Sequence, residues 1–296
     1  ADVLSMVLLG ANQRALSAGE MHAQAAEIVE LIEERRLLTG TGFSLRDAGE
    51  VEAALLPMMQ SGLVKRFDDA SVKVYYIPEK KHLAAAYYRN TITHYFLPAA
   101  LGEIALAMCA GEGEAADEAS LRARVMSLRD LYKCEFFFQL TDTFWREVLA
   151  SGNKRYVGWQ GDGVPLESLL RGSPPLFGHA ILRSITEAYL VIAGTLLARG
   201  SRPVANDRAL TRRLLRRGEQ MLLRRRISCE SSLSQDLFRA GLRLADYRQL
   251  LDGDGETLGQ AREESAAFVL RTLSAINLLQ RSYDRYWFNE LPADMS

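Results

Sequence analysis

The sequence contains few of the residues around which disulfides, metal sites and nucleophilic catalysis are usually built. Its 296 residues include three cysteines, at 109, 134 and 229, and four histidines. Three distant cysteines predict no disulfide framework, and without closely spaced Cys or His we expect no metal site. The sequence also has no G-x-S-x-G, no glycine-rich phosphate loop and no H-E-x-x-H. We therefore expect no catalytic residue and no cofactor in this chain.

An excess of charge and a long apolar run are missing as well. The 36 basic and 37 acidic residues give a formal charge of −1, so nothing in the overall charge attracts nucleic acid, and we expect no such partner. No charge-free run reaches the roughly 18 to 20 residues that a membrane-spanning helix needs. The chain begins without methionine and in an apolar, helix-like run, from which we expect a piece of a longer protein.

What is present in the first 78 residues predicts three helices followed by a β-hairpin. Ser17 with Glu20 forms a capping box before an apolar helical face, and Ser44 with Asp47 marks a later helix start. The segments on either side of residues 68–70 have the composition of paired strands. Helices followed by a small β-wing are typical of winged-helix domains. The third helix carries more acids than its single arginine, which favours a protein-contacting or purely structural wing over DNA binding.

Everything after residue 79 predicts helix. We expect a mainly α fold with a winged-helix-like lobe at 1–78, bearing one β-hairpin, and a multi-helix bundle domain at 79–296. Glycine and proline clusters near 161–175 mark a longer excursion between two of the bundle's helices. The predicted helices are 80–110, 118–151, 176–199, 207–226, 231–251 and 256–288.

A polar and aromatic cluster precedes the apolar part of the first bundle helix, in "AAAYYRNTITHYFLPAALG" (84–102). We take Tyr88, Arg89, Asn90 and His94 as candidate binding residues and expect the last three to share one face. A histidine in this position is more often a satisfied, half-buried polar group than a catalyst. The cluster either holds a junction between domains or reaches toward a substrate phosphate. The junction is favoured, because no second phosphate-binding element accompanies Arg89.

Four segments, in this order, resemble the C-terminal region of the membrane-associated glycerol-3-phosphate and dihydroxyacetone-phosphate acyltransferases. They contain a Tyr/Arg/Asn helix after a hairpin, a K-x-E-F-F-F segment, an E-x-Y helix and an arginine- and serine-rich stretch. The resemblance implies an enzyme that transfers an acyl chain from acyl-carrier protein or acyl-CoA to glycerol 3-phosphate, the first step of phospholipid synthesis. The segments are 62–106, 128–148, 181–196 and 225–245.

The chain lacks the motif that carries catalysis in that family. The family's histidine and aspartate are spaced H-x-x-x-x-D, whereas His22, His82, His94 and His179 are followed at that spacing by Glu, Tyr, Ala and Ser. We therefore expect a non-catalytic C-terminal part, inactive alone, whose partner is the catalytic domain of the same protein. Its expected location is peripheral, on the cytoplasmic side of the cell membrane. The alternative is a stand-alone regulatory or protein-interaction module with a helical ligand or dimerisation domain.

Residues 199–226 are the most basic part of the chain. They hold ten arginines and two acids, a net charge of +8. On a helical wheel one broad face carries arginines and the other carries leucines and a methionine. Such a helix suits an anionic membrane surface or an acidic acyl-carrier protein, and equally a solvated face whose arginines pair with acids elsewhere. The arginines of this face are Arg212, Arg213, Arg216, Arg217 and Arg224.

Overall fold

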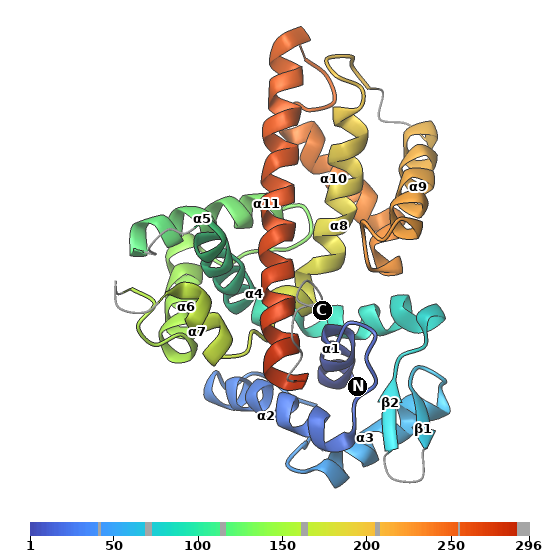
Figure 1. Ribbon diagram of the computed structural model, residues 1–296, viewed down its shortest axis with the longest axis vertical. Helices are drawn as coiled ribbons and strands as arrows, with labels where there is room; N and C mark the ends of the chain where they lie inside the picture. Colours follow the sequence, from blue (N-terminus) through green and yellow to red (C-terminus); the bar gives the residue numbers. More distant parts are fainter. Residues whose placement is uncertain are drawn as a thin grey trace, which may run out of the picture.

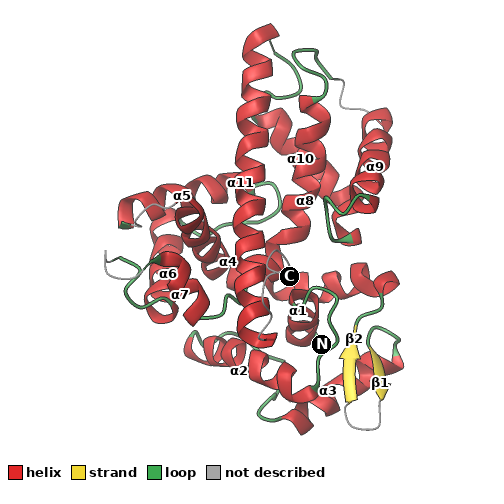
Figure 2. Cartoon of the chain, viewed as in Figure 1, coloured by secondary structure: helices red, strands yellow, loops and turns green. Residues whose placement is uncertain are grey.

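The computed structural model describes residues 1–40, 43–68, 73–112, 117–160, 165–204, 208–253 and 255–288. Within these ranges the protein is mainly α-helical, with one two-stranded sheet (Figure 2). Short 3₁₀ turns at Glu79–Lys81 and Glu230–Leu233 precede two of the helices. The elements are α1 (Asp2–Gly10), α2 (Ala18–Glu34), α3 (Ala48–Gln60), β1 (Lys65–Asp68), β2 (Lys73–Tyr76), α4 (His82–Glu112), α5 (Glu118–Leu131), α6 (Thr141–Arg155), α7 (Leu166–Gly172), α8 (Gly178–Leu197), α9 (Arg208–Leu223), α10 (Gln235–Tyr247) and α11 (Gly255–Phe288).

The predicted order of three helices and a hairpin is confirmed at the N-terminus. The capping box forms as expected: Ser17 N donates to Glu20 Oε2 at 2.7 Å, and Glu20 N donates to Ser17 Oγ at 3.2 Å. β1 and β2 pair antiparallel, and Leu16 adds a single bridge to Tyr75 beside them. These local elements follow from residues close together in the sequence.

Helix α1 connects this N-terminal region to the rest of the molecule. It packs against α4 and α8 as well as against α2, and its side chains Leu4 and Met6 are buried. Its Gly10 lies so close to Ala180 of α8 that an added Cβ would come within 3.1 Å of the alanine Cβ. The division into a lobe at 1–78 and a bundle domain at 79–296 stays a prediction, because the first helix contacts both parts.

The bundle is organised around three long helices, α4, α8 and α11. α11 runs along α8 and crosses α4, with α5 and α6 on one side and α9 and α10 on the other (Figure 1). α10 approaches α8 very closely at Gly241, where an added Cβ would lie 2.4 Å from Ile192 Cδ1. Most of α8 is therefore covered by neighbouring helices.

Two helices are long and apolar enough to cross a membrane by composition alone, α4 with its preceding turn and α8. In this fold 83% and 78% of their most apolar windows are buried inside the protein. Burial within the bundle already accounts for their apolar character.

One predicted helix is wrong. The segment 118–151 forms two helices, α5 and α6, separated by residues 132–140. Phe138 packs edge-on against Phe144 with ring centroids 5.3 Å apart, and the side chain of Arg129 in α5 donates to Gln139 O at 2.8 Å. These contacts stabilise a non-helical connection that helical propensity alone does not reveal.

Other helix boundaries differ more modestly. The excursion at 161–175 contains the short helix α7, which we did not expect. The predicted helix 231–251 is a 3₁₀ turn followed by α10, and the helix predicted at 207–226 ends at Leu223. There Arg225 takes the left-handed conformation, with φ of 54°, and ends the helical path.

Candidate functional site

Arg89 of the predicted cluster is buried and binds α8. Its side chain is 5% exposed, its Nη1 donates to Ala180 O at 2.9 Å, and its Nη2 donates to Ser184 Oγ at 3.4 Å. Burial lowers the pKa of the Arg89 guanidinium from its ordinary value. The residue therefore joins the first half of α4 to the first turns of α8.

The other three residues of the cluster face solvent. Tyr88, Asn90 and His94 are exposed, so the expectation of a half-buried, satisfied histidine is wrong. Residues five apart on a helix are rotated by about 140°, which turns His94 away from the face that Arg89 presents to α8. Asn90 Oδ1 accepts from Arg89 Nε at 3.2 Å and from Nη2 at 3.0 Å. The structure thus brings Arg89 and Asn90 together and leaves His94 apart.

Glu187, in the E-x-Y segment, holds the arginine- and serine-rich stretch against α8. Its Oε1 accepts from Ser228 N at 3.0 Å and from Ser228 Oγ at 2.7 Å. Its Oε2 accepts from Cys229 N at 3.1 Å and from Ser232 Oγ at 2.8 Å. One buried carboxylate thus orders residues 228–232 with four hydrogen bonds, and such charge-assisted bonds are the stronger kind.

The K-x-E-F-F-F segment also binds α8. The hydroxyls of Tyr132 and Thr186 are hydrogen-bonded at 2.6 Å in a buried setting. Three residues further along each segment, Tyr189 donates its hydroxyl to Glu135 Oε1 at 3.4 Å. Burial raises the pKa of Glu135 to about 7. The segments that we singled out as motifs therefore meet on one helix, α8, and their polar residues bind each other.

Glu103, which sequence reasoning missed, caps the beginning of the same helix. Its carboxylate accepts backbone N–H bonds from Leu176 at 2.9 Å, Phe177 at 3.0 Å and Gly178 at 2.7 Å. Burial raises its pKa although these bonds and the nearby charge of Arg155 act in the opposite direction. A lone acid within the apolar run at 95–110 is the sequence signal that points to such a buried partner.

Helix α9 is amphipathic as predicted. Leu210 and Leu214 are buried, whereas Arg212, Arg213, Arg216 and Arg224 are exposed. Arg217 differs from these four because it is half-buried, and its guanidinium lies over Gly194 of α8.

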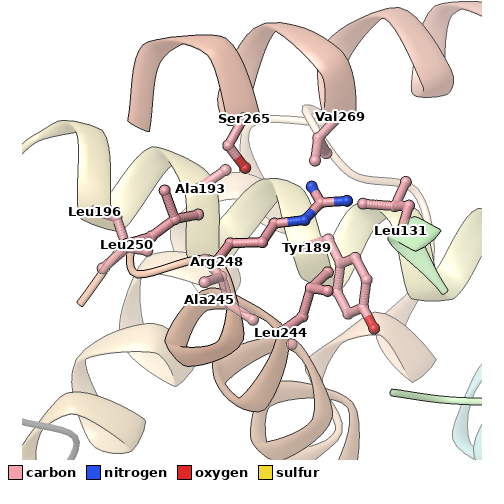
Figure 3. A pocket seen from close by; sticks show the side chains of 12 residues that line it. Leu131, Tyr189, Ala193, Leu196, Leu244, Ala245, Arg248, Leu250, Ser265 and Val269 are labelled. Atoms are coloured by element: carbon pink, nitrogen blue, oxygen red, sulfur yellow. The ribbon is translucent and has the colours of Figure 1, made fainter. Parts of the chain in front are cut away.

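The crevice between α8, α10 and α11 carries no site. It is lined largely by apolar side chains such as Leu131, Ala193 and Val269, and the side chain of Arg248 runs across it (Figure 3). Its volume of about 30 Å³ has room for about one water molecule. Arg248 is already bound, because its Nη2 lies 2.6 Å from Asp130 Oδ2. Within the described ranges no three His, Cys, Asp or Glu side chains are grouped to hold a metal ion.

Comparison with known proteins places this arrangement in a family. Residues 1–254 match the family described as "Glycerol-3-phosphate acyltransferase C-terminal region". Proteins named "Putative acyltransferase plsB1" from Mycobacterium bovis and from two strains of Mycobacterium tuberculosis are each 31% identical to the chain over 284 residues. The alignments cover 94% of this chain and 45% of each relative, so the chain spans about half the length of the curated relatives it matches. The chain belongs to the family of glycerol-3-phosphate acyltransferase C-terminal regions.

Proposed function

We propose that the chain is the non-catalytic C-terminal part of a glycerol-3-phosphate 1-O-acyltransferase. The whole enzyme would transfer an acyl chain from acyl-carrier protein or acyl-CoA to the sn-1 hydroxyl of glycerol 3-phosphate. The family match over residues 1–254 is the observation that carries the proposal. Because the sequence contains no H-x-x-x-x-D, we infer a non-catalytic role for this part.

The contacts on α8 support a role as a scaffold. Arg89, Glu135 and Glu187 each bind backbone or side-chain groups within the described residues. A group so engaged is held in place and is poorly available to a substrate. We infer that these motif residues keep α4, α8 and the 228–232 stretch in one arrangement on which the catalytic part rests.

The exposed face of the first turns of α4 is our proposed contact with the catalytic domain. Leu83 is 62% exposed and Tyr87 is 72% exposed, one turn apart on the same face. Tyr88 and His94 are exposed nearby. Large apolar and aromatic side chains of this kind are typical of interface cores, and histidine adds a polar partner.

Helix α9 supports a peripheral position on the cytoplasmic membrane face. Its exposed arginines suit anionic lipid, and an acidic acyl-carrier protein offers the same kind of charge. The alternative is a stand-alone regulatory or protein-interaction module, and the packing of α1 against α4 and α8 counts against an independent N-terminal binding lobe.

Two experiments test the proposed function. Reading the gene upstream of the codon for Ala1 should reveal a domain with the H-x-x-x-x-D spacing, and a start codon at Ala1 would refute the proposal. The purified 296-residue chain should transfer no acyl group to glycerol 3-phosphate, whereas the chain with its upstream part should do so. Saturable turnover by the 296-residue chain alone would show that catalytic groups lie within it.

A further inference from the structure

A cleft lined with arginines lies between the end of α8 and α9. Its volume is about 500 Å³, and five of its eight lining residues are arginines. No lining residue is acidic. The residues are Thr195, Ala198, Arg199, Arg202, Arg213, Arg216, Arg217 and Gln220.

Arg217 is built into the wall of this cleft. Gly194 leaves room for it: an added Cβ there would come within 3.1 Å of Arg217 Nη2 and 3.5 Å of Nε. Among the described residues, Arg217 Nε is buried without a hydrogen-bond partner. A buried donor without an acceptor is costly, so a small shift that brings this N–H to an anion in the cleft would be favourable.

Within the described ranges the arginines of the cleft also lack a carboxylate partner. In the described part of the chain none of the five forms an ion pair, whereas Arg35, Arg155 and Arg248 each reach a carboxylate. Several guanidinium groups around one concavity repel one another and raise the local positive potential. An anion in the cleft would relieve this repulsion.

We propose that this cleft binds a phosphate group. Guanidinium groups match phosphate oxygens with paired hydrogen bonds, and a phosphate offers more charge and more acceptors than a single carboxylate. The group belongs either to an anionic lipid headgroup or to a soluble phosphate ester. The proposal concerns a ligand site of this chain, and it holds whether or not the whole protein is an acyltransferase.

The first arm of the test uses soluble probes. Inorganic phosphate and glycerol 3-phosphate are titrated into the 296-residue chain, with binding followed by calorimetry and by the Nε–H NMR signal of Arg217. We expect saturable binding that weakens roughly tenfold or more in the variant R213Q/R216Q/R217Q. The control R46Q/R146Q/R281Q removes the same charge from exposed arginines outside the cleft and outside α9, and it should bind as the wild type does.

A second variant separates geometry from charge. G194A keeps every arginine, but its new Cβ would lie 3.1 Å from Arg217 Nη2, so the guanidinium has to shift by a few tenths of an ångström. Alanine favours the helix over glycine, so this variant should stay folded, which thermal unfolding checks. We expect weaker binding in G194A at unchanged net charge.

The second arm identifies the source of the phosphate. Vesicles of phosphatidylcholine with and without phosphatidic acid are sedimented with each variant. A larger loss in R213Q/R216Q/R217Q than in the equally charged control assigns a lipid headgroup to the cleft. Equal losses, together with saturable binding of the soluble probes, assign a soluble phosphate ester. The proposal is overturned if neither arm shows binding, or if cleft and control variants lose binding equally in both arms.

Discussion

Glu103 in α4 accepts a hydrogen bond from the backbone N–H of Gly178, the first residue of α8, at 2.7 Å. The N–H groups of the two preceding residues point to the same carboxylate. A helix begins with unpaired N–H groups and a partial positive charge, both of which a buried carboxylate satisfies. The relationship fixes where the central helix α8 begins relative to α4.

Replacing Glu103 with alanine should therefore destabilise the fold strongly. Three buried N–H groups would lose their acceptor, and we expect the free energy of unfolding to fall by roughly 2 to 4 kcal/mol. E103Q keeps one acceptor oxygen and should lie between the wild type and E103A. Urea unfolding measures these differences. The control E118A, at an exposed position in α5, should change little, and a comparably small effect of E103A would contradict the capping role.

Arg89 and His94 should behave differently although they lie in one motif. R89M keeps the apolar stem but removes the bonds to Ala180 and Ser184, so we expect a loss of about 1 to 3 kcal/mol. H94A removes an exposed side chain and should stay within about 0.5 kcal/mol of the wild type. Thermal and urea unfolding of both variants decides the matter. A steep activity loss in the whole enzyme carrying H94A, with unchanged stability, would favour direct contact of His94 with substrate over a structural role.

The structural features that we predicted correctly depend on residues close together in the sequence. The capping box of Ser17 and Glu20, the hairpin and the basic face of α9 all follow from short-range patterns, and they are present. The break between α5 and α6 was missed because it rests on contacts with residues further along the chain. Among these contacts is the bond between Glu135 and Tyr189, which are 54 positions apart.

The candidate site also depends on contacts between residues far apart in the sequence. The motif segments were recognised as a set, but nothing in their spacing indicated that they all meet on α8. The exposure of His94 follows from which side of α4 faces α8, and the order of residues alone does not specify that. Glu187 stood inside a quoted motif, yet its role became visible only when α8 and residues 228–232 were seen together.

His179 should make stability depend on pH in mildly acidic solution. Burial, followed by the charge of Arg183, lowers its pKa to about 3 from an ordinary 6.5. The stability that comes from the neutral ring is fully present above pH 6.5. It is lost as the pH falls toward 3, because only the unfolded chain takes up the proton in this range. Between pH 7 and 5 the wild type should lose more stability than H179F, by up to about 1.4 kcal/mol per pH unit. Parallel urea-stability profiles for the two proteins would contradict this assignment.

Glu135 should make stability depend on pH in the opposite direction. Its pKa is raised to about 7, so the stability from its protonated form is complete below about pH 4.5 and is lost as the pH rises through 7. E135Q imitates the protonated carboxyl and should remove this decline. The difference in unfolding free energy between E135Q and wild type should therefore grow in favour of the variant from pH 5 to 8. A constant difference would mean that Glu135 keeps an ordinary pKa in the folded protein.

The exposed arginines of α9 should bind the chain to anionic membranes in a salt-sensitive way. Each cation near an anionic surface contributes about 1 kcal/mol, and salt screens this attraction within a Debye length. The helix presents no Trp or Phe for deeper insertion, and its apolar residues Leu210 and Leu214 are already buried against the bundle. We therefore expect peripheral binding to phosphatidylglycerol vesicles at low salt and release at high salt.

Sedimentation of the wild type beside R212Q/R213Q/R216Q/R217Q measures this contribution. A control with the same loss of charge, R46Q/R146Q/R271Q/R281Q, removes exposed arginines from other elements. Because membrane attraction depends on where the charge lies, the α9 variant should lose most of its binding while the control retains most of it. If both variants bind as well as the wild type, or if the wild type fails to bind, α9 is not the membrane contact. The acidic acyl-carrier protein then becomes the partner to test against the same two variants, because its surface would select the same arginines through charge complementarity.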